Sequence, residues 1–178
     1  MGVAFCSRGP GCLSHDAGVE LSIELATRAI ARRVVRGRRD PDTDPEWAEG
    51  YPLEGDRRAC EVYLGQLPVL SGGSRLSPFG YYQILVEGVV VGGIGFHGPP
   101  VNGLVEVGYG VVPSVRGRGV ATEALRLLLD LAVDLGGVRR ACGRTTPDNV
   151  ASQRVMLAAG MRFSGRDEEF LHFDTDLA

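Results

Sequence analysis

The sequence lacks the features that mark membrane, secreted and metal-binding proteins. It has no apolar run approaching the roughly 18 residues of a membrane-spanning helix. No apolar run near its start resembles a secretory signal either. Its four cysteines show no close Cys-x-x-Cys spacing, and only three histidines accompany them, which disfavours a zinc site or a disulfide framework. We therefore expect a cytoplasmic protein without a bound metal.

Charge and length are typical of a single-domain globular protein. The formal net charge of −3 gives no general attraction for nucleic acid, so any phosphate binding must come from a local arrangement. With 178 residues, 44% of them hydrophobic, the chain can bury one sizeable core. We expect an N-terminal tail over residues 1–16, whose Gly, Pro and Ser follow no period, and one domain over residues 17–178.

The segment 104–126 combines a strand, a glycine-rich turn and the start of a helix. An apolar run ends at Pro113 and leads into the turn Arg116-Gly117-Arg118-Gly119. Apolar residues then recur at helical spacing over residues 120–135. Such a unit aims free backbone N–H groups and the positive end of a helix dipole at one point, which is how proteins hold phosphates.

The rest of the pattern predicts an α+β domain with a mixed, mostly antiparallel sheet, in the order βααβββαβαββ. Short turns join three successive strands, which must therefore be antiparallel, whereas a helix leads from the third strand to the next. The change from hairpins to crossovers falls at the glycine turn, where ligands often bind. The expected strands are 18–23, 81–87, 89–96, 105–112, 138–145, 161–165 and 170–175, and the expected helices are 24–35, 56–66, 120–135 and one between Asp148 and Gly160.

Two common nucleotide-binding patterns fit the turn poorly. A P-loop requires Lys followed by Ser or Thr after its last glycine, but Val120 and Ala121 follow Gly119. A Rossmann fingerprint requires three spaced glycines early in a parallel fold, whereas this turn offers two glycines and follows hairpins. The turn therefore calls for another kind of phosphate-bearing ligand.

The sequence from Val105 to Phe163 resembles the GNAT superfamily of N-acetyltransferases. Residues 116–121, RGRGVA, match the family's acetyl-CoA loop, Gln/Arg-x-x-Gly-x-Gly/Ala. The flanking sequences EVGY and ATEAL are similar to the Rim-type branch, the ribosomal-protein N-terminal acetyltransferases and their relatives. Downstream, NVASQRVMLAAGMRF resembles that branch's N-x-x-S-x-x-V-x-x-x-x-G-F segment, and GGIGFHG resembles the family's third strand. The resemblance implies the GNAT fold.

The resemblance also implies that acetyl-CoA binds at the glycine turn. Glycines let the backbone approach the pyrophosphate, and N–H groups at the helix start point at it. In this family the strand before the turn splays from the next one, so its backbone pairs with the pantetheine arm. Asn149 commonly contacts the pantetheine side, although a plain helix cap explains it equally. The implied cofactor-binding residues are Val111, Val112, Arg116, Gly117, Arg118, Gly119, Val120, Ala121 and Asn149.

GNAT enzymes usually transfer the acetyl group by direct attack of an amine on the thioester, which requires a base, oxyanion donors and a proton for the thiolate. Strand alternation puts Glu106 beside two glycines on one face. The resemblance favours Glu106 as the base, directly or through water, against a solvated or structural role, with His97 as a second candidate. The family's frequent general-acid tyrosine is replaced by Val155 and Met156, so Ser152 is the predicted proton donor, unless it only caps its helix.

The acceptor pocket is expected between the loops at 38–56 and 68–80 and the turn at His97. Trp47, Tyr51 and His97 are the predicted substrate-binding residues, although the two loop aromatics would also serve to pin the loop to the core. We expect acetyl-CoA-dependent N-acetylation of a primary amine, on a peptide N-terminus or a small molecule, by a monomer or homodimer that binds neither nucleic acid nor a membrane. A non-catalytic acyl-CoA-binding sensor or scaffold is the alternative.

Overall fold

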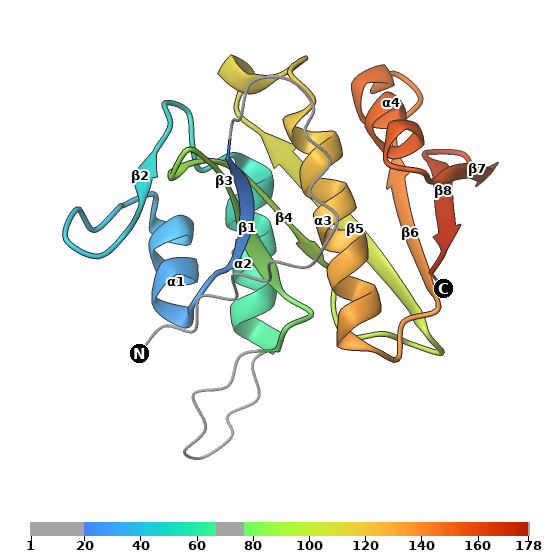
Figure 1. Ribbon diagram of the computed structural model, residues 1–178, viewed down its shortest axis with the longest axis horizontal. Helices are drawn as coiled ribbons and strands as arrows, with labels where there is room; N and C mark the ends of the chain where they lie inside the picture. The colour runs from blue at the N-terminus through green and yellow to red at the C-terminus, as the bar shows by residue number, and fades with distance from the viewer. Residues whose placement is uncertain (1–19, 67–76, 178) are drawn as a thin grey trace.

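The computed structural model describes residues 20–66 and 77–177, so the expected tail over 1–16 and most of the 68–80 loop lie outside the described residues. One mixed sheet has the order β1-β3-β4-β5-β6-β8-β7, and β2 pairs with β4 (Figure 1). The strands are β1 (Leu21–Leu25), β2 (Glu46–Trp47), β3 (Tyr81–Val86), β4 (Val89–Phe96), β5 (Leu104–Val111), β6 (Arg140–Thr145), β7 (Arg162–Arg166) and β8 (Leu171–Asp176). The α-helices are α1 (Arg28–Arg36), α2 (Glu54–Gln66), α3 (Val120–Leu135) and α4 (Val150–Ala158).

The first helix begins later than the sequence predicts. Residues 24 and 25 extend β1, which pairs with β3, instead of starting α1. Thr27 sets the boundary, because its hydroxyl accepts the N–H of Ile30 at 3.1 Å and caps the helix. The predicted end is confirmed, since Gly37 closes α1 in the left-handed conformation with φ of 62°.

The central hairpins form as predicted. Strands β3, β4 and β5 are consecutive antiparallel neighbours. Glu87 and Gly88, which join β3 to β4, both have positive φ angles, 50° and 78°, as a tight two-residue hairpin turn requires. The connection from β5 to β6 passes through α3, and the two strands are parallel.

The 38–56 segment is more ordered than the predicted loop. Glu46 and Trp47 form β2, a short parallel partner of β4 that no alternation in the sequence announces. The helix expected to begin at Asp56 begins two residues earlier, at Glu54. Asp44 is buried and pairs with Arg33 of α1, so this acidic side chain stabilises the loop.

Helices α2 and α3 cover opposite faces of the same central strands. Helix α1 packs on α2, and both α2 and α3 lie against β4 and β5 (Figure 1). The core is apolar, with Ile84, Ile94, Leu125 and Leu128 fully buried. Strand β5 is thus held from both sides, which fixes the position of every side chain it carries.

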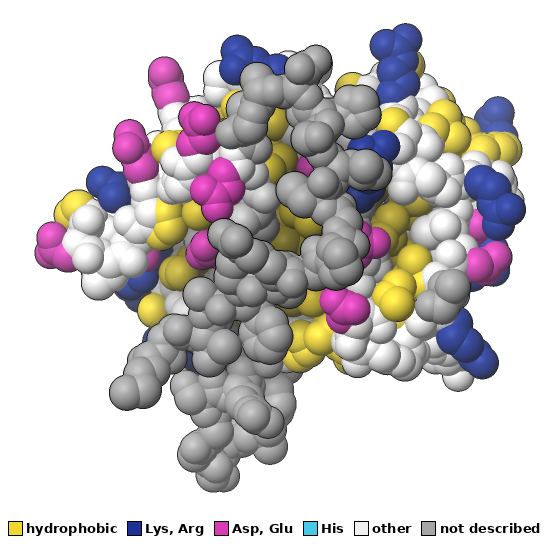
Figure 2. Space-filling model, in the orientation of Figure 1, with side chains coloured by type: hydrophobic (Ala, Val, Ile, Leu, Met, Phe, Trp, Pro, Cys, Tyr) yellow, Lys and Arg dark blue, Asp and Glu magenta, His cyan; other side chains and the backbone are white. Residues whose placement is uncertain are grey.

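The surface carries mixed charge. Figure 2 shows basic and acidic side chains interspersed on one face, with hydrophobic side chains visible between them. This distribution agrees with the small net charge of the sequence. Within residues 20–66 and 77–177, no helix combines the length and the apolarity needed to cross a bilayer.

Candidate active site

The glycine turn has the geometry of an anion cradle. Gly117 and Gly119 have φ angles of 73° and 81°, in the left-handed region that favours glycine. Gly119 is the N-cap of α3, and no side chain in the described part of the chain caps this helix, so the N–H groups of its first turn point outward from the helix end. Arg116 is bent back, because its Nε donates to the carbonyl of Val111 at 3.2 Å. The exposed side chain of Arg118 lies at the tip of the turn.

Strands β5 and β6 separate beside this cradle. Their parallel pairing runs only from Leu104↔Arg140 to Glu106↔Cys142, although β5 continues to Val111 and β6 to Thr145. The pairing therefore stops five residues before β5 ends, which leaves a wedge between the two strands. We call this space the β5–β6 wedge.

Only alternate residues of β5 present backbone groups to the β5–β6 wedge. His97 donates its N–H to the carbonyl of Glu106 at 2.9 Å, and Val112 donates to the carbonyl of Val91 at 2.8 Å. Because antiparallel ladders alternate, Tyr109 and Val111 then direct their backbone groups away from β4. The pairing of Val111 and Val112 with the pantetheine arm stays a prediction, and of the two it is Val111 that faces the β5–β6 wedge, since the Val112 N–H is used within the sheet.

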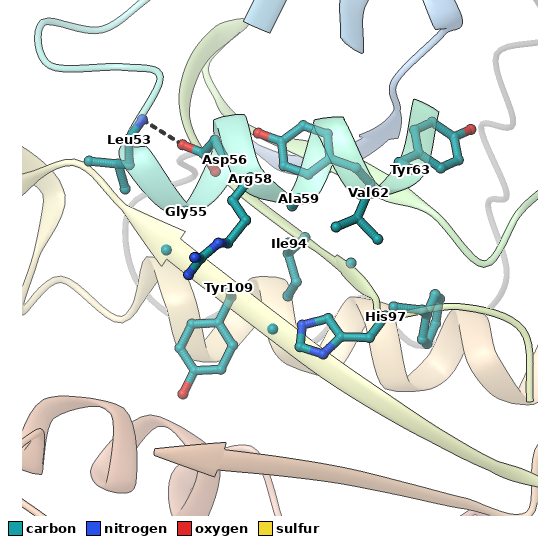
Figure 3. Close-up of a pocket in the computed structure, with 16 residues that line it drawn as sticks. Leu53, Gly55, Asp56, Arg58, Ala59, Val62, Tyr63, Ile94, His97 and Tyr109 are labelled. Carbon is teal, nitrogen blue, oxygen red and sulfur yellow. Dashed lines mark hydrogen bonds between the residues drawn. The ribbon is translucent and has the colours of Figure 1, made fainter. Parts of the chain in front are cut away.

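The wedge is bridged by a hydroxyl pair. Tyr109 projects from β5 toward α4 (Figure 3), and its hydroxyl lies 2.9 Å from Ser152 Oγ and 3.0 Å from the Ser152 carbonyl. Burial raises the pKa of Tyr109, which keeps the phenol protonated at neutral pH. Asn149 caps α4 through its Oδ1, which accepts the N–H of Ser152 at 3.1 Å. This hydrogen bond supports the interpretation of Asn149 as the N-cap of α4.

A cavity of about 490 Å³ opens between α2 and strands β4 and β5 (Figure 3). It exists because four glycines form its floor: Gly93 pairs with Gly110, and Gly95 pairs with Gly108, on the face toward α2. Because these positions carry no side chains, the described residues leave the space under the helix open. Apolar side chains in its wall include Leu53, Ala59 and Val62.

His97 connects the large cavity to the predicted base. Its Nδ1 lies 3.2 Å from Glu106 Oε1, and Arg144 Nε lies 3.0 Å from the same oxygen. Its Nε2 lies over Gly108, where an added Cβ would stand only 2.7 Å away. Glu106 lines a smaller neighbouring cavity of about 220 Å³ and not the large one. The imidazole therefore stands between the carboxylate and the large cavity.

Two predicted substrate-binding residues do not reach the large cavity. Trp47 packs edge-to-face on Tyr51 with ring centroids 5.0 Å apart. Tyr51 is 8% exposed, and its hydroxyl bonds to Tyr81 at 2.9 Å and accepts from Gln83 at 3.2 Å. Neither residue lines the cavity, so the structure favours the alternative that they fix the loop to the core. The cavity wall is formed by α2, which the sequence did not assign to the site.

Asp56 is a buried acid in that wall. It is 3% exposed, and its Oδ2 accepts the N–H of Leu53 at 2.8 Å. Burial raises the pKa of Asp56 to about 6, while hydrogen bonds from Leu53 and Tyr81 oppose the rise. Burial also raises the pKa of Tyr81 well above its usual value.

This acid makes stability depend on pH. Between about pH 4 and pH 6 the folded protein keeps a proton on Asp56 that the unfolded chain has released. The free energy of unfolding should therefore fall as pH rises through this range, by on the order of 3 kcal/mol. In Asp56→Asn this fall should vanish, whereas Glu61→Gln, an exposed acid of the same helix, should retain it. Urea unfolding at pH 4, 6 and 8 measures the effect, and parallel curves for wild type and Asp56→Asn would contradict it.

Four residues of the site were not predicted from the sequence: Tyr109, Asp56, Tyr81 and Arg144. Tyr109 lies on the opposite strand face from Glu106, which hid its role. Asp56 lies in a helix expected only to contribute packing. A usable signal was present in the glycines of GGIG and GYG, since alternate glycines on two adjacent strands leave one face of a sheet bare.

The chain is similar in sequence to known acetyltransferases. A family model described as an acetyltransferase (GNAT) domain matches residues 23–162. An uncharacterized N-acetyltransferase of Bacillus subtilis (strain 168), YjdG, is 33% identical over 85 residues, 47% of this chain and 51% of that protein. The ribosomal-protein-serine acetyltransferase of Escherichia coli (strain K12) is 31% identical over 94 residues, 51% and 52% of the two chains. The chain spans about half the length of these curated relatives.

Solved structures share the fold at low identity. The ribosomal-protein-S5-alanine acetyltransferase from Vibrio fischeri aligns with a TM-score of 0.63 at 16% identity, covering 88% of this chain and 93% of that chain. The aminoglycoside acetyltransferase AAC(6')-Ib in complex with coenzyme A aligns with a TM-score of 0.61 at 15% identity, covering 88% and 95%.

Proposed function

Because the chain belongs to the GNAT acetyltransferase family, we propose that it is an acetyl-CoA-dependent N-acetyltransferase that acts on a primary amine. One observation carries the proposal. Strand β5 borders the wedge beside the glycine cradle along one edge and forms the floor of the large cavity on one face. A thioester held in the wedge and an amine held in the cavity would therefore meet across the same strand.

The residues of the wedge and cradle fit coenzyme A. Gly117 and Gly119 leave open space, since a Cβ at either would meet no atom within 4 Å. The uncapped start of α3 offers N–H donors for a pyrophosphate. Tyr109 and the N–H of Val111 offer backbone groups to an extended amide-bearing arm, as an added strand would use them, while the Val111 carbonyl accepts Arg116 Nε. When bound, acetyl-CoA supplies the activated acetyl group, and a related fold binds coenzyme A.

His97 is placed to remove a proton from the amine. The Glu106 carboxylate beside Nδ1 favours the tautomer with a proton on Nδ1. That tautomer leaves the Nε2 lone pair free at the cavity. Glu106 then holds the ring and stabilises its charged form after the proton arrives. In this proposal Glu106 acts through His97, and the half-exposed imidazole releases the proton to solvent.

Tyr109 and Ser152 are placed to supply a proton to the leaving sulfur. The phenol bridges to α4 within the wedge, and its partner Ser152 holds the hydroxyl in position. As the C–N bond forms and the C–S bond breaks, the thiolate takes the Tyr109 proton, which solvent then replaces. In this proposal Tyr109 donates the proton and Ser152 positions the phenol, which differs from the role predicted for Ser152 as the proton donor.

A thiol-release assay tests the function. Wild-type protein should release free coenzyme A from acetyl-CoA in the presence of a reactive amine, and mass spectrometry should find the amine 42 Da heavier, roughly the mass that acylation adds. Tyr109→Phe should release thiol about 10²-fold more slowly with acetyl-CoA affinity unchanged. All 19 basic residues of the Lys+Arg count are arginine, so the chain has no lysine of its own to acetylate. Acetyl-CoA binding without acetylation across a broad amine panel would instead identify a non-catalytic acyl-CoA-binding module.

A further inference from the structure

The large cavity has a different polar group at each end of its glycine floor. Asp56 lies over Gly93, where an added Cβ would collide with the Asp56 carboxylate. His97 lies over Gly108 in the same way. Since Gly93 pairs with Gly110, Gly93 and Gly108 are diagonal neighbours on β4 and β5. Diagonal neighbours on adjacent strands are about 7–8 Å apart.

Asp56 is a buried carboxylate without a cationic partner among the described residues. Its Oδ2 accepts the N–H of Leu53, which is a helix-capping contact. Its Oδ1 faces Gly93 on the cavity floor, beside the Tyr81 hydroxyl. The carboxylate thus has two neutral donors, the Leu53 N–H and the Tyr81 hydroxyl, but no ion pair among the described residues. A buried anion is costly unless a cation or further donors compensate it.

The surrounding polar groups hold this end of the cavity in place. The Tyr81 hydroxyl bonds to that of Tyr51 at 2.9 Å, and Gln83 donates to Tyr51 at 3.2 Å. All three residues are buried. They are neutral side chains, so they orient Asp56 without neutralising its charge. A cation can reach the Asp56 carboxylate through the cavity, which Asp56 lines.

The space between the two ends suits an alkyl chain. Ala59 and Val62 of α2 contribute apolar lining there, over the bare glycine backbone of β4 and β5. An extended chain of six bonds, as between two amines separated by five carbons, spans about 7 Å. This length matches the diagonal from Gly93 to Gly108.

On the basis of the proposed acetyl transfer, we propose that the acceptor is a linear diamine whose distal ammonium group binds Asp56 while the amine to be acetylated lies at His97. The ammonium donates to Oδ1 and neutralises the buried carboxylate. The five-carbon spacer packs on the apolar wall. The near amine then faces Nε2 of His97, beside the strand that borders the wedge.

Arg58 is a positively charged residue that lines the same cavity and would repel a diamine. It reaches from α2 toward β5 at the cavity (Figure 3), and its side chain is exposed. Its charge is therefore screened by water and salt, whereas the charge of Asp56 is not. The buried acid decides which group the far end of the cavity accepts.

Binding of two matched amines tests the inference without depending on catalysis. Calorimetry in the presence of coenzyme A compares 1,5-diaminopentane with pentylamine, which lacks only the second amine. Wild type should bind the diamine at least about tenfold more tightly, as a charge-assisted hydrogen bond to a buried group predicts. Asp56→Asn, whose side-chain oxygen still accepts the Leu53 N–H, should remove this preference. Glu61→Gln removes an exposed charge from the same helix and should keep it.

The outcomes separate the two proposals. Equal binding of both amines by wild type, binding of neither, or a preference that survives in Asp56→Asn would overturn the diamine inference. Asp56-dependent binding of the diamine without acetyl transfer would support the inference and overturn only the proposed enzymatic function. Gly110→Ala adds a check on location, because its Cβ enters the floor and would meet only Leu53 Cδ1, at 3.2 Å. It should weaken diamine binding while the protein stays folded.

Discussion

Replacement of His97 by glutamine is expected to lower kcat by about 100-fold or more, the usual contribution of a positioned general base. Of the residues that the structure describes, the amine would lose the one imidazole that lines the large cavity. The loss should shrink at high pH, where a larger fraction of the amine is already unprotonated. Steady-state kinetics from pH 6 to pH 10, with saturating acetyl-CoA, measures the effect.

Glu106 supplies the discriminating comparison. If it acts through His97, Glu106→Gln should cost less than His97→Gln, and the double variant should be no worse than His97→Gln alone, since coupled residues are not additive. Arg144→Gln removes the other partner of Glu106 without touching the imidazole and should have a small effect. A near-normal rate for His97→Gln together with a severe loss for Glu106→Gln would restore Glu106 as the direct base.

Introduction of a carboxylate at Gly119 should weaken acetyl-CoA binding by about 100-fold. Gly119→Glu places a negative charge at the N-terminus of α3, where a repulsion of about 3 kcal/mol at close range corresponds to that factor. A Cβ at this position meets no atom within 4 Å, so steric collision does not explain a loss. Calorimetry with acetyl-CoA measures the affinity.

Two controls isolate the charge. Gly119→Ala carries the same left-handed backbone strain, with φ of 81°, but no charge, and should bind acetyl-CoA far better than Gly119→Glu. S-acetylpantetheine has no pyrophosphate, so its affinity should be the same for Gly119→Glu and Gly119→Ala. If Gly119→Glu binds acetyl-CoA as wild type does, the pyrophosphate lies elsewhere.

Local sequence signals predicted most of the fold. The apolar period of residues 120–135 corresponds to α3 at both ends, and Gly37 ends α1 as expected. The GNAT fold implied by the turn and its flanks is confirmed by the family match and by the solved structures. The errors fall where a tertiary contact overrides a local preference. β1 runs on to Leu25 because β3 pairs with it, and β2 forms only because β4 lies alongside.

The candidate site likewise has a part that local sequence predicts and a part that depends on tertiary contacts. Residues 116–121 could be assigned from sequence, because a cradle built from consecutive backbone N–H groups depends on local conformation. The proposed base and acid could not, because each combines residues from distant segments: His97 with Glu106 and Arg144, and Tyr109 with Ser152. Alternation placed Glu106 on the correct face but could not show that an imidazole stands between it and the cavity.

The sequence by itself determined the family, the order of the elements and the glycine turn, since helical period, strand alternation and glycine conformation act over a few neighbouring residues. Only the tertiary structure decided which residues from distant segments lie beside the turn and its strand. It placed α2 over the glycine floor, closed the cavity between Asp56 and His97, and opened the wedge by ending the β5–β6 pairing at Glu106. These are distances between segments far apart in the chain, and the packing of α2 and α4 on the sheet sets them.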